Sequence, residues 1–310
     1  MKKKIVAIII CTFNGENYLK KQLKSIIDQS YPFIDIFISD DGSTDGTLGI
    51  IEKFITENKG LNISMHNGPK DGYAKNFILT AIKAHNSKER EYSYYAFCDQ
   101  DDIWHKDKVK NAINKLNDYP LAKPLIFCSR THYIGLNDEI IGTSPLFKKK
   151  PSFRNALVQS IAGGNTMLLN YHALETLNGI NLNLNIVSHD WLLYLTVTAN
   201  NGIVYYEKIP SVLYRQHKDN LIGSNNNLIS IFKRVVYLLN GSFKEWTDSN
   251  IKHLQNTNLE AEASDILKYF QLTKSNNIVT RINGLKKSGV YRQTLLGNIT
   301  LFIAVIFKKL

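Results

Sequence analysis

Short apolar runs and longer amphipathic segments alternate along the first 130 residues of the chain. The apolar runs are rich in β-branched and aromatic residues, which predicts buried strands. They cover residues 4–11, 34–39, 61–65, 94–98 and 125–128. Between the first three runs, residues 16–29 and 47–58 place apolar side chains every three or four positions, which predicts helices with one buried face. This alternation predicts an α/β fold with a mostly parallel central sheet flanked by helices.

The pattern loosens after residue 130 and then resumes. The expected elements are a helix at 152–160, a strand at 166–170, a helix at 190–199 and two strand-like pieces within 205–214. Pro210 should interrupt the last two pieces, because proline cannot donate to a strand ladder. From residue 228 onward the pattern is helical. We therefore expect one α/β unit over residues 1–220 and a helical C-terminal region over 221–310.

The composition is that of a soluble globular protein, with 310 residues, 44% of them hydrophobic and 21% charged. Cys11, Cys98 and Cys128 lie in or beside apolar runs and have no CxxC spacing. We expect buried, reduced thiols and a cytoplasmic location. Residues 2–4 are basic, but the apolar run that follows is too short for a secretion signal and lacks a cleavage site, so we expect it to be the first strand.

The net charge of +11 suits nucleic acid, an anionic membrane or a phosphorylated substrate. No stripe of Arg and Lys interleaved with aromatic residues occurs, and Arg is scarce beside Lys, so we do not expect nucleic-acid binding. The apolar segment 295–307 lies between the lysine pairs 286–287 and 308–309. This pattern suits a helix at a membrane surface, and it equally suits a C-terminal helix packed on the domain.

An acidic cluster follows the fourth apolar run, in residues 97–104 (FCDQDDIW). Asp99, Asp101 and Asp102 supply the hard oxygen ligands that Mg²⁺ or Mn²⁺ prefers, and such ions also bind substrate phosphates. A nucleotide diphosphate is therefore the expected third party. The alternative is that these carboxylates cap a helix over 106–117.

Two further polar turns follow strands, at residues 11–17 (CTFNGEN) and 39–46 (SDDGSTDG). Neither turn matches GxGxxG or GxxxxGK[ST], so a classical dinucleotide site or P-loop is not expected. A carboxylate from Asp40 or Asp41 could accept the imide N–H of uracil or thymine. The alternative for Asp40 is a hydrogen bond inside its own turn.

These three motifs, in this order on successive strand ends, resemble family 2 of the inverting glycosyltransferases, which have the GT-A nucleotide-sugar fold. The resemblance covers roughly residues 4–220 and implies a nucleotide-binding half (1–130) and an acceptor half (131–220). Together with residues 188–191 (SHDW) and 214–217 (YRQH), the acidic cluster is most similar to bacterial rhamnosyltransferase-like enzymes of surface-polysaccharide assembly.

The resemblance implies roles for particular residues. Asp190 would be the general base that deprotonates the acceptor hydroxyl, although it could instead cap the helix that follows. Asp101 and His217 would bind the metal, although a lone histidine is more often a hydrogen-bonded structural residue. The residues that would bind the donor nucleotide are Thr12, Asn14, Glu16, Asp41, Lys75 and Asp99. Further contacts to the donor or acceptor would come from Asp102, Gly164, Asn165, His189, Trp191 and Arg215.

The implied cofactor is Mn²⁺ or Mg²⁺, and the implied donor is dTDP-rhamnose or a UDP-hexose. The implied acceptor is a lipid-linked glycan, which places the protein in the cytoplasm at the inner face of the bacterial cell membrane, with homo-oligomerisation left open. Two alternatives remain: a glucosyl- or galactosyltransferase that uses a UDP-sugar, and a non-catalytic membrane-associated subunit of a polysaccharide assembly complex. A nucleotidyltransferase would also use paired carboxylates, but it would not need Asp190.

Overall fold

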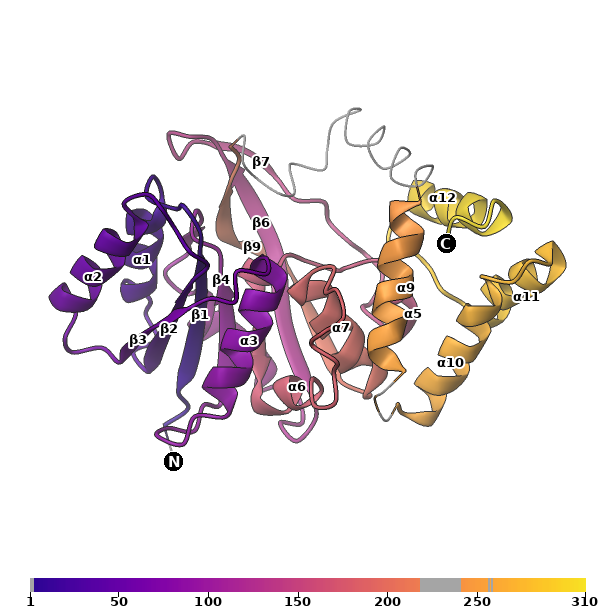
Figure 1. Ribbon diagram of the computed structural model, residues 1–310, viewed down its shortest axis with the longest axis horizontal. Coiled ribbons are helices and arrows are strands. Elements are labelled where there is room, and N and C mark those ends of the chain that lie inside the picture. Colours follow the sequence, from indigo (N-terminus) through magenta and orange to yellow (C-terminus); the bar gives the residue numbers. More distant parts are fainter. Residues whose placement is uncertain (1–2, 218–240, 256, 258) are drawn as a thin grey trace.

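The computed structural model describes residues 3–217, 241–255, 257 and 259–310. In these residues a nine-stranded sheet forms the centre of the molecule, with helices on both sides (Figure 1). Its strands run in the order β3-β2-β1-β4-β8-β6-β9-β5, and β7 pairs with β6. The strands are β1 (Val6–Thr12), β2 (Ile34–Asp40), β3 (Ile63–Asn67), β4 (Tyr94–Cys98), β5 (Ile103–Trp104), β6 (Leu125–Ile134), β7 (Ile140–Thr143), β8 (Leu168–Asn170) and β9 (Ile203–Arg215).

Six strands run in one direction, and β5, β7 and β8 run against them. Because β1, β2, β3 and β4 are parallel neighbours, their carboxyl ends meet at one edge of the sheet. Ligands in open α/β sheets bind at this edge. The predicted mostly parallel sheet is confirmed.

The helices of the α/β unit cover the two faces of the sheet. They are α1 (Leu19–Ile27), α2 (Thr47–Glu57), α3 (Tyr73–His85), α4 (Lys108–Leu116), α5 (Phe153–Ala156), α6 (Tyr171–Glu175) and α7 (His189–Ala199). The apolar faces of α1, α2 and α4 pack with alternate residues of the strands in one cluster. The opposite cluster joins the other face of the sheet to α3, α5 and α7, as expected for strands buried on both sides.

Two sequence-based expectations were wrong. The helix expected at 152–160 is only α5, which Ser152 caps by accepting a hydrogen bond from the Asn155 amide. The strand expected to break at Pro210 is instead the continuous strand β9, which includes Pro210. Its pairing with β6 shifts register between Ser129 and Thr131, so the residues around Pro210 bulge out of the ladder. A bulge tolerates proline, since no ladder hydrogen bond is needed there.

The helical C-terminal region, expected over residues 221–310, is confirmed for the described residues, whereas residues 221–240, 256 and 258 of that expectation lie outside them. It consists of α9 (Ser242–Leu254), α10 (Ala261–Leu272), α11 (Ile278–Ser288) and α12 (Leu295–Ile306). Hydrogen bonds near α5 join this region to the α/β unit. The side-chain amide of Asn155 donates to the Tyr291 carbonyl at 2.9 Å. The Gln293 side chain accepts from the Lys149 backbone amide and donates to the Lys149 carbonyl, both at 3.1 Å. No helix in the described parts of the chain is long and apolar enough to cross a membrane.

Candidate active site

The loops after β1 and β2 are bonded to each other at the carboxyl edge of the sheet. The side chains of Thr12, Asn14 and Glu16, which were expected to bind nucleotide, form hydrogen bonds with the end of β2 or the loop after it. Thr12 donates to the Asp40 carboxylate at 2.7 Å, Asn14 accepts from the Thr44 amide at 2.8 Å and from the Thr44 hydroxyl at 3.4 Å, and Glu16 accepts from the Gly46 amide at 2.7 Å. Asn14 adopts φ of 49°, a left-handed conformation that asparagine tolerates better than most residues. The structure therefore brings these three residues together in one fixed loop pair.

Asp40 and Asp41 have different surroundings. Asp40 is buried and accepts hydrogen bonds from the Thr12 hydroxyl, the Gly42 amide, and both the amide and the hydroxyl of Ser43. The structural alternative for Asp40 is thus confirmed. Asp41 is partly exposed and accepts one hydrogen bond from the Lys70 amide at 2.6 Å. Of the two carboxylates, Asp41 is the one placed to receive a ligand.

Gln100 connects the first loop to the acidic cluster, a role that the sequence did not reveal. Its side chain accepts a hydrogen bond from the Phe13 amide and donates one to the Phe13 carbonyl, both at 2.9 Å. The Gln100 side chain also fills the space that a Cβ on Gly15 would need. Glycine at position 15 therefore allows the two loops to meet.

Among the acidic residues after β4, Asp99 lies close to Asp190. Burial, together with the charges of Asp101 and Asp190, raises the pKa of Asp99 to about 8. Burial also raises the pKa of Asp102 well above its usual range, with contributions from Asp101 and Asp99. The pKa of Asp190 is raised by burial as well. Negative charges gathered in this way favour the binding of a cation.

The alternatives in which these carboxylates only cap helices find little support. β5 lies between Asp102 and α4, and α4 begins after Asp107 without a side-chain cap. Asp190 is in the first turn of α7, where its carboxylate accepts a hydrogen bond from the Trp191 amide, while Ser188 occupies the cap position.

His217 lies beside Asp101, although 116 residues separate the two in the chain. Its Nε2 is 2.7 Å from an Asp101 carboxylate oxygen, and its ring lies 5.2 Å from the ring of Tyr18. A carboxylate and an imidazole together suit Mn²⁺. In the described residues no group of three or more His, Cys, Asp or Glu side chains could hold a metal alone. This donor set still fits Mg²⁺ or Mn²⁺, because such ions usually complete their coordination with water and substrate phosphates.

Asp102 links the acidic cluster to Asn165 and Arg215. The buried Asp102 carboxylate accepts hydrogen bonds from the Asn165 side-chain amide and from the Arg215 backbone amide. The Arg215 side chain is fully buried, donates to the Asp101 carbonyl at 3.0 Å and forms an ion pair with Asp138 at 2.5 Å. This geometry indicates that Asn165 and Arg215 hold the acidic motif in place, and it does not favour direct contact between them and a leaving group.

His189 and Trp191 flank Asp190 and are both buried. The indole of Trp191 donates to the Ala156 carbonyl at 2.6 Å, so this side chain anchors α7 to α5. The His189 ring stacks on Phe77 with ring centroids 4.2 Å apart. Burial lowers the pKa of His189 to about 3, which keeps the ring neutral at physiological pH. Its Nε2 occupies the space where Gly164 would otherwise carry a Cβ.

Tyr73 and Lys75 begin α3, on the same side of the site. Burial raises the pKa of the Tyr73 hydroxyl, and the charges of Asp190 and Asp99 raise it further, so this hydroxyl lies near both carboxylates. No sequence motif indicated that Tyr73 lies at the site. The Lys75 ammonium is 2.6 Å from Asp71.

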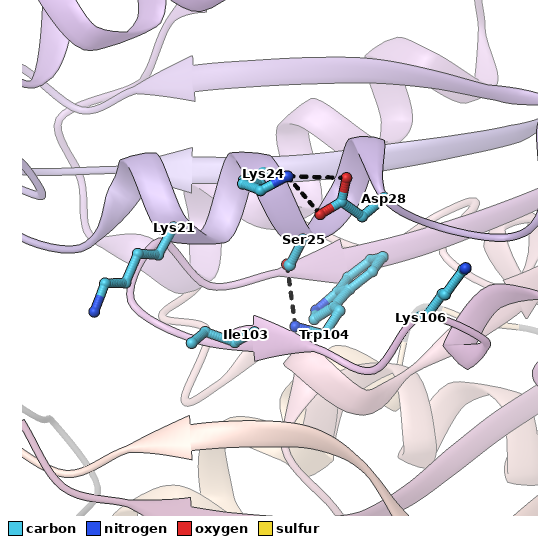
Figure 2. Close-up of a pocket in the computed structure, with 7 residues that line it drawn as sticks. All are labelled: Lys21, Lys24, Ser25, Asp28, Ile103, Trp104 and Lys106. Atoms are coloured by element: carbon cyan, nitrogen blue, oxygen red, sulfur yellow. Dashed lines mark hydrogen bonds and ion pairs between the residues drawn. The ribbon is translucent and has the colours of Figure 1, made fainter. Parts of the chain in front are cut away.

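A cavity of about 500 Å³ lies next to α1 and β5 (Figure 2). Its lining residues are Lys21, Lys24, Ser25, Asp28, Ile103, Trp104 and Lys106. Figure 2 shows Lys24 paired with Asp28 and the Trp104 backbone amide bonded to Ser25. None of the residues expected to bind donor, acceptor or metal lines this cavity, so the candidate site is the acidic edge of the sheet.

Comparison with known proteins identifies the family of this chain. Residues 7–176 match the family described as glycosyl transferase family 2. The chain is 32% identical over 257 residues to the dTDP-rhamnosyl transferase RfbG of Shigella flexneri, an alignment that covers 76% of this chain and 81% of RfbG. It is 30% identical over 138 residues to the UDP-Glc:alpha-D-GlcNAc-diphosphoundecaprenol beta-1,3-glucosyltransferase WfaP of Escherichia coli, covering 44% of this chain and 50% of WfaP.

A solved structure gives the same fold. TarS of S. aureus in complex with UDP-GlcNAc superposes with a TM-score of 0.59 at 19% identity, over 92% of this chain and 80% of TarS. That similarity concerns the fold alone, and it confirms the expected GT-A-like architecture. With the family match over more than half of the chain and a relative aligned over most of both lengths, this chain belongs to glycosyl transferase family 2 and is a glycosyltransferase.

Proposed function

We propose that this enzyme transfers rhamnose from dTDP-rhamnose to a hydroxyl group of a lipid-linked glycan, with inversion, during synthesis of a cell-surface polysaccharide. The observation that carries the proposal is the proximity of Asp99 to both Asp101 and Asp190. The 32% identity to a dTDP-rhamnosyl transferase supports the donor. The relative WfaP, named for a diphosphoundecaprenol acceptor, supports a lipid-linked glycan at the inner face of the membrane.

Asp190 acts as the general base in this proposal. Its carboxylate accepts the proton of the acceptor hydroxyl while that oxygen attacks the anomeric carbon on the face opposite the nucleotide, so the configuration inverts in one displacement. Burial raises the pKa of Asp190, which makes the carboxylate a stronger base. The neutral ring of His189 packs beside it and holds the end of α7 against Phe77.

The nucleotide occupies the edge formed by the loops after β1, β2 and β4. Asp41 accepts the imide N–H of the base, and Asp99 binds the ribose. Thr12, Asn14 and Glu16 shape the pocket through the bonded loop pair, and Lys75 closes one side. Asp101 and His217 would hold Mn²⁺ or Mg²⁺, which when bound neutralises the charge that develops on the leaving diphosphate.

One alternative donor has a specific observation in its favour. WfaP is named for UDP-glucose, and it is 30% identical to this chain over 138 residues, so a UDP-hexose is the second candidate. Thymine and uracil present the same imide group to Asp41, which therefore cannot distinguish the two nucleotides.

The test is a transfer assay with the purified protein, Mn²⁺ and a synthetic diphosphate-lipid glycan. The donors compared are dTDP-rhamnose, UDP-glucose and UDP-galactose, and nucleotide release and glycan mass are both measured. We expect turnover with dTDP-rhamnose, and turnover with a UDP-hexose alone would contradict the rhamnose assignment. Ligand-induced thermal stabilisation, measured in parallel without acceptor, detects donor binding when the chosen acceptor is wrong. Stabilisation by none of the three donors would favour a non-catalytic subunit.

A further inference from the structure

The outer face of α12 is apolar along its whole length. Side chains on this face are between 39% and 80% exposed. They are Leu295, Leu296, Ile299, Phe302 and Ile303, with Phe307 directly after the helix. Their spacing of three to four residues aligns them in one stripe, which we call the α12 stripe. The opposite face, with Leu301, Ala304 and Val305, is buried in the core.

This arrangement differs from that of an ordinary surface helix, which exposes polar residues opposite its buried face. The helix is also held firmly at both ends. Thr294 caps its start by accepting a hydrogen bond from the Gly297 amide. The buried Arg281 of α11 donates to the carbonyls of Val305 and Ile306, both at 2.7 Å, at its end. The α12 stripe is therefore a fixed feature of the fold.

Positive charge surrounds the stripe. From residue 266 to residue 310 the chain contains eight Lys and Arg residues and no Asp or Glu. Arg292 precedes α12, Lys308 and Lys309 follow it, and Lys286 and Lys287 end the neighbouring α11. Contact with a second copy of this surface would bring like charges together. Anionic lipid headgroups would instead place negative charges next to these Lys and Arg side chains.

The length of α12 agrees with a helix that lies in a lipid surface. Its 12 residues span about 18 Å, much less than the hydrocarbon core of a bilayer, which is about 30 Å thick. In Figure 1, α12 lies at the upper right of the molecule beside α9, whereas β1 and β4 lie to the left.

We propose that the α12 stripe docks the enzyme on an anionic lipid bilayer, with the apolar side chains among the acyl chains and the flanking lysines at the headgroups. This docking surface goes beyond the proposed transfer reaction, because it requires neither a particular donor nor a particular glycan. It assigns the membrane-surface helix expected from the sequence to the outer face of α12.

The test measures co-sedimentation of the full chain with vesicles in the absence of any sugar nucleotide. Vesicles of phosphatidylcholine with phosphatidylglycerol are compared with vesicles of phosphatidylcholine alone. In the stripe variant, Leu296→Gln, Ile299→Gln and Phe302→Gln are combined. The control variant changes three exposed apolar residues on the sheet, Ile140→Gln, Ile141→Gln and Ile209→Gln.

We expect the stripe variant to lose at least about tenfold in partitioning to anionic vesicles, since each glutamine removes the gain from burying an apolar side chain in lipid. The control variant should bind like the wild type. The pair Lys308→Gln and Lys309→Gln should lower binding to anionic vesicles by about fivefold per charge and leave the weak binding to neutral vesicles unchanged.

Equal vesicle binding by the stripe and control variants would overturn the proposal. So would a wild-type dimer that the stripe variant converts to monomer in light scattering without any loss of lipid binding. A thermal unfolding midpoint equal to that of the wild type verifies that the stripe variant is folded. Because no donor is present, failure here leaves the transfer assay unaffected, and failure of that assay leaves this result unaffected.

Discussion

At the scale of single residues, the acidic cluster depends on contacts that lie outside the acidic motif itself. Gln100 bonds the loop after β1, Arg215 donates to the backbone of Asp101, and Asn165 donates to Asp102. Each contact joins segments far apart in the chain. A short motif can therefore place several carboxylates together because the rest of the fold holds the loop in one conformation.

The first prediction concerns Asp190. Asp190→Asn should lower kcat at least about a thousandfold, because the amide cannot accept the proton of the acceptor hydroxyl. Donor binding should change less than about twofold, since Asp190 acts on the acceptor and not on the nucleotide. Calorimetric titration with dTDP-rhamnose and Mn²⁺ measures the binding, and loss of that binding in the variant would refute the assignment.

The second prediction concerns Gly164, whose position excludes any side chain. Gly164→Ala would place a methyl group on the His189 imidazole, so the ring and the adjacent Asp190 must shift. We expect kcat to fall about a hundredfold and stability to fall by about 1–3 kcal/mol. Gly49→Ala in α2 is the control, because no atom lies near the added methyl group, and it should leave transfer unchanged. Similar activities of the two variants would show that His189 does not constrain Asp190.

The third prediction concerns Asp138, a positioning residue that pairs with both Arg215 and Lys21, at 2.5 Å and 2.6 Å. Asp138→Asn removes the charge that holds Arg215 beneath Asp101. We expect the Mn²⁺ concentration for half-maximal activity to rise about tenfold. Lys21→Gln removes only the exposed partner of Asp138. It should change the Mn²⁺ concentration for half-maximal activity less than about twofold, because surface ion pairs contribute little. Equal effects of the two changes would indicate a general loss of stability.

At the scale of elements, the sequence predicted best where local pattern and tertiary environment agree. Strands β1, β2 and β4 were recognised because burial on both faces makes them continuous apolar runs. β9 was predicted as two pieces, because the bulge that accommodates Pro210 depends on pairing with β6. The short strands β5 and β7 have no pattern of their own and exist through their partners.

The candidate site follows the same rule. The order of the three motifs indicated Asp99 and Asp101, and the family resemblance then indicated Asp190, because these residues follow or begin regular elements. Asp138 and Gln100 could not be found, since their roles arise from contacts across 77 and 87 residues, respectively. The supporting position of Arg215 depends on how deeply β9 is buried, which spacing along the chain does not reveal.

The fourth prediction concerns α4, which carries a buried lysine. The Lys108 ammonium lies 3.6 Å from the centre of the Trp104 ring, and burial lowers its pKa to about 7 against the attraction of Cys98 and Asp102. Between this value and the unfolded value of about 10.5 the unfolded chain binds more protons. Lys108 therefore makes stability rise with pH above about 7.

Urea unfolding of the wild type and of Lys108→Met, measured from pH 6 to pH 9, tests this assignment. The variant should be more stable at pH 6 by a few kcal/mol, because it no longer buries a charged group, and the difference should shrink as pH rises. The difference between the two proteins isolates Lys108 from other titrating groups. A difference that stays constant with pH would mean that Lys108 does not titrate in this range.

At the scale of the whole molecule, the core joins the catalytic sheet to the C-terminal helices. One apolar cluster includes residues of β1, α3 and α7 together with residues of α9, α10 and α12. The outer face of α12 is thus held in a fixed orientation relative to the acidic edge of the sheet. Docking through α12 would hold the catalytic sheet near an acceptor whose lipid tail lies in the same bilayer.

The fifth prediction joins the two proposals. With a glycan acceptor embedded in anionic vesicles, the stripe variant should lose at least about tenfold in kcat/KM, because docking raises the local concentration of enzyme at the acceptor. With a short-chain, water-soluble acceptor its kcat/KM should equal that of the wild type, since α12 contributes no residue to the acidic cluster. An equal loss on both acceptors would mean that the substitutions damage the catalytic sheet. No loss on either would mean that the enzyme reaches its membrane-bound acceptor without using α12.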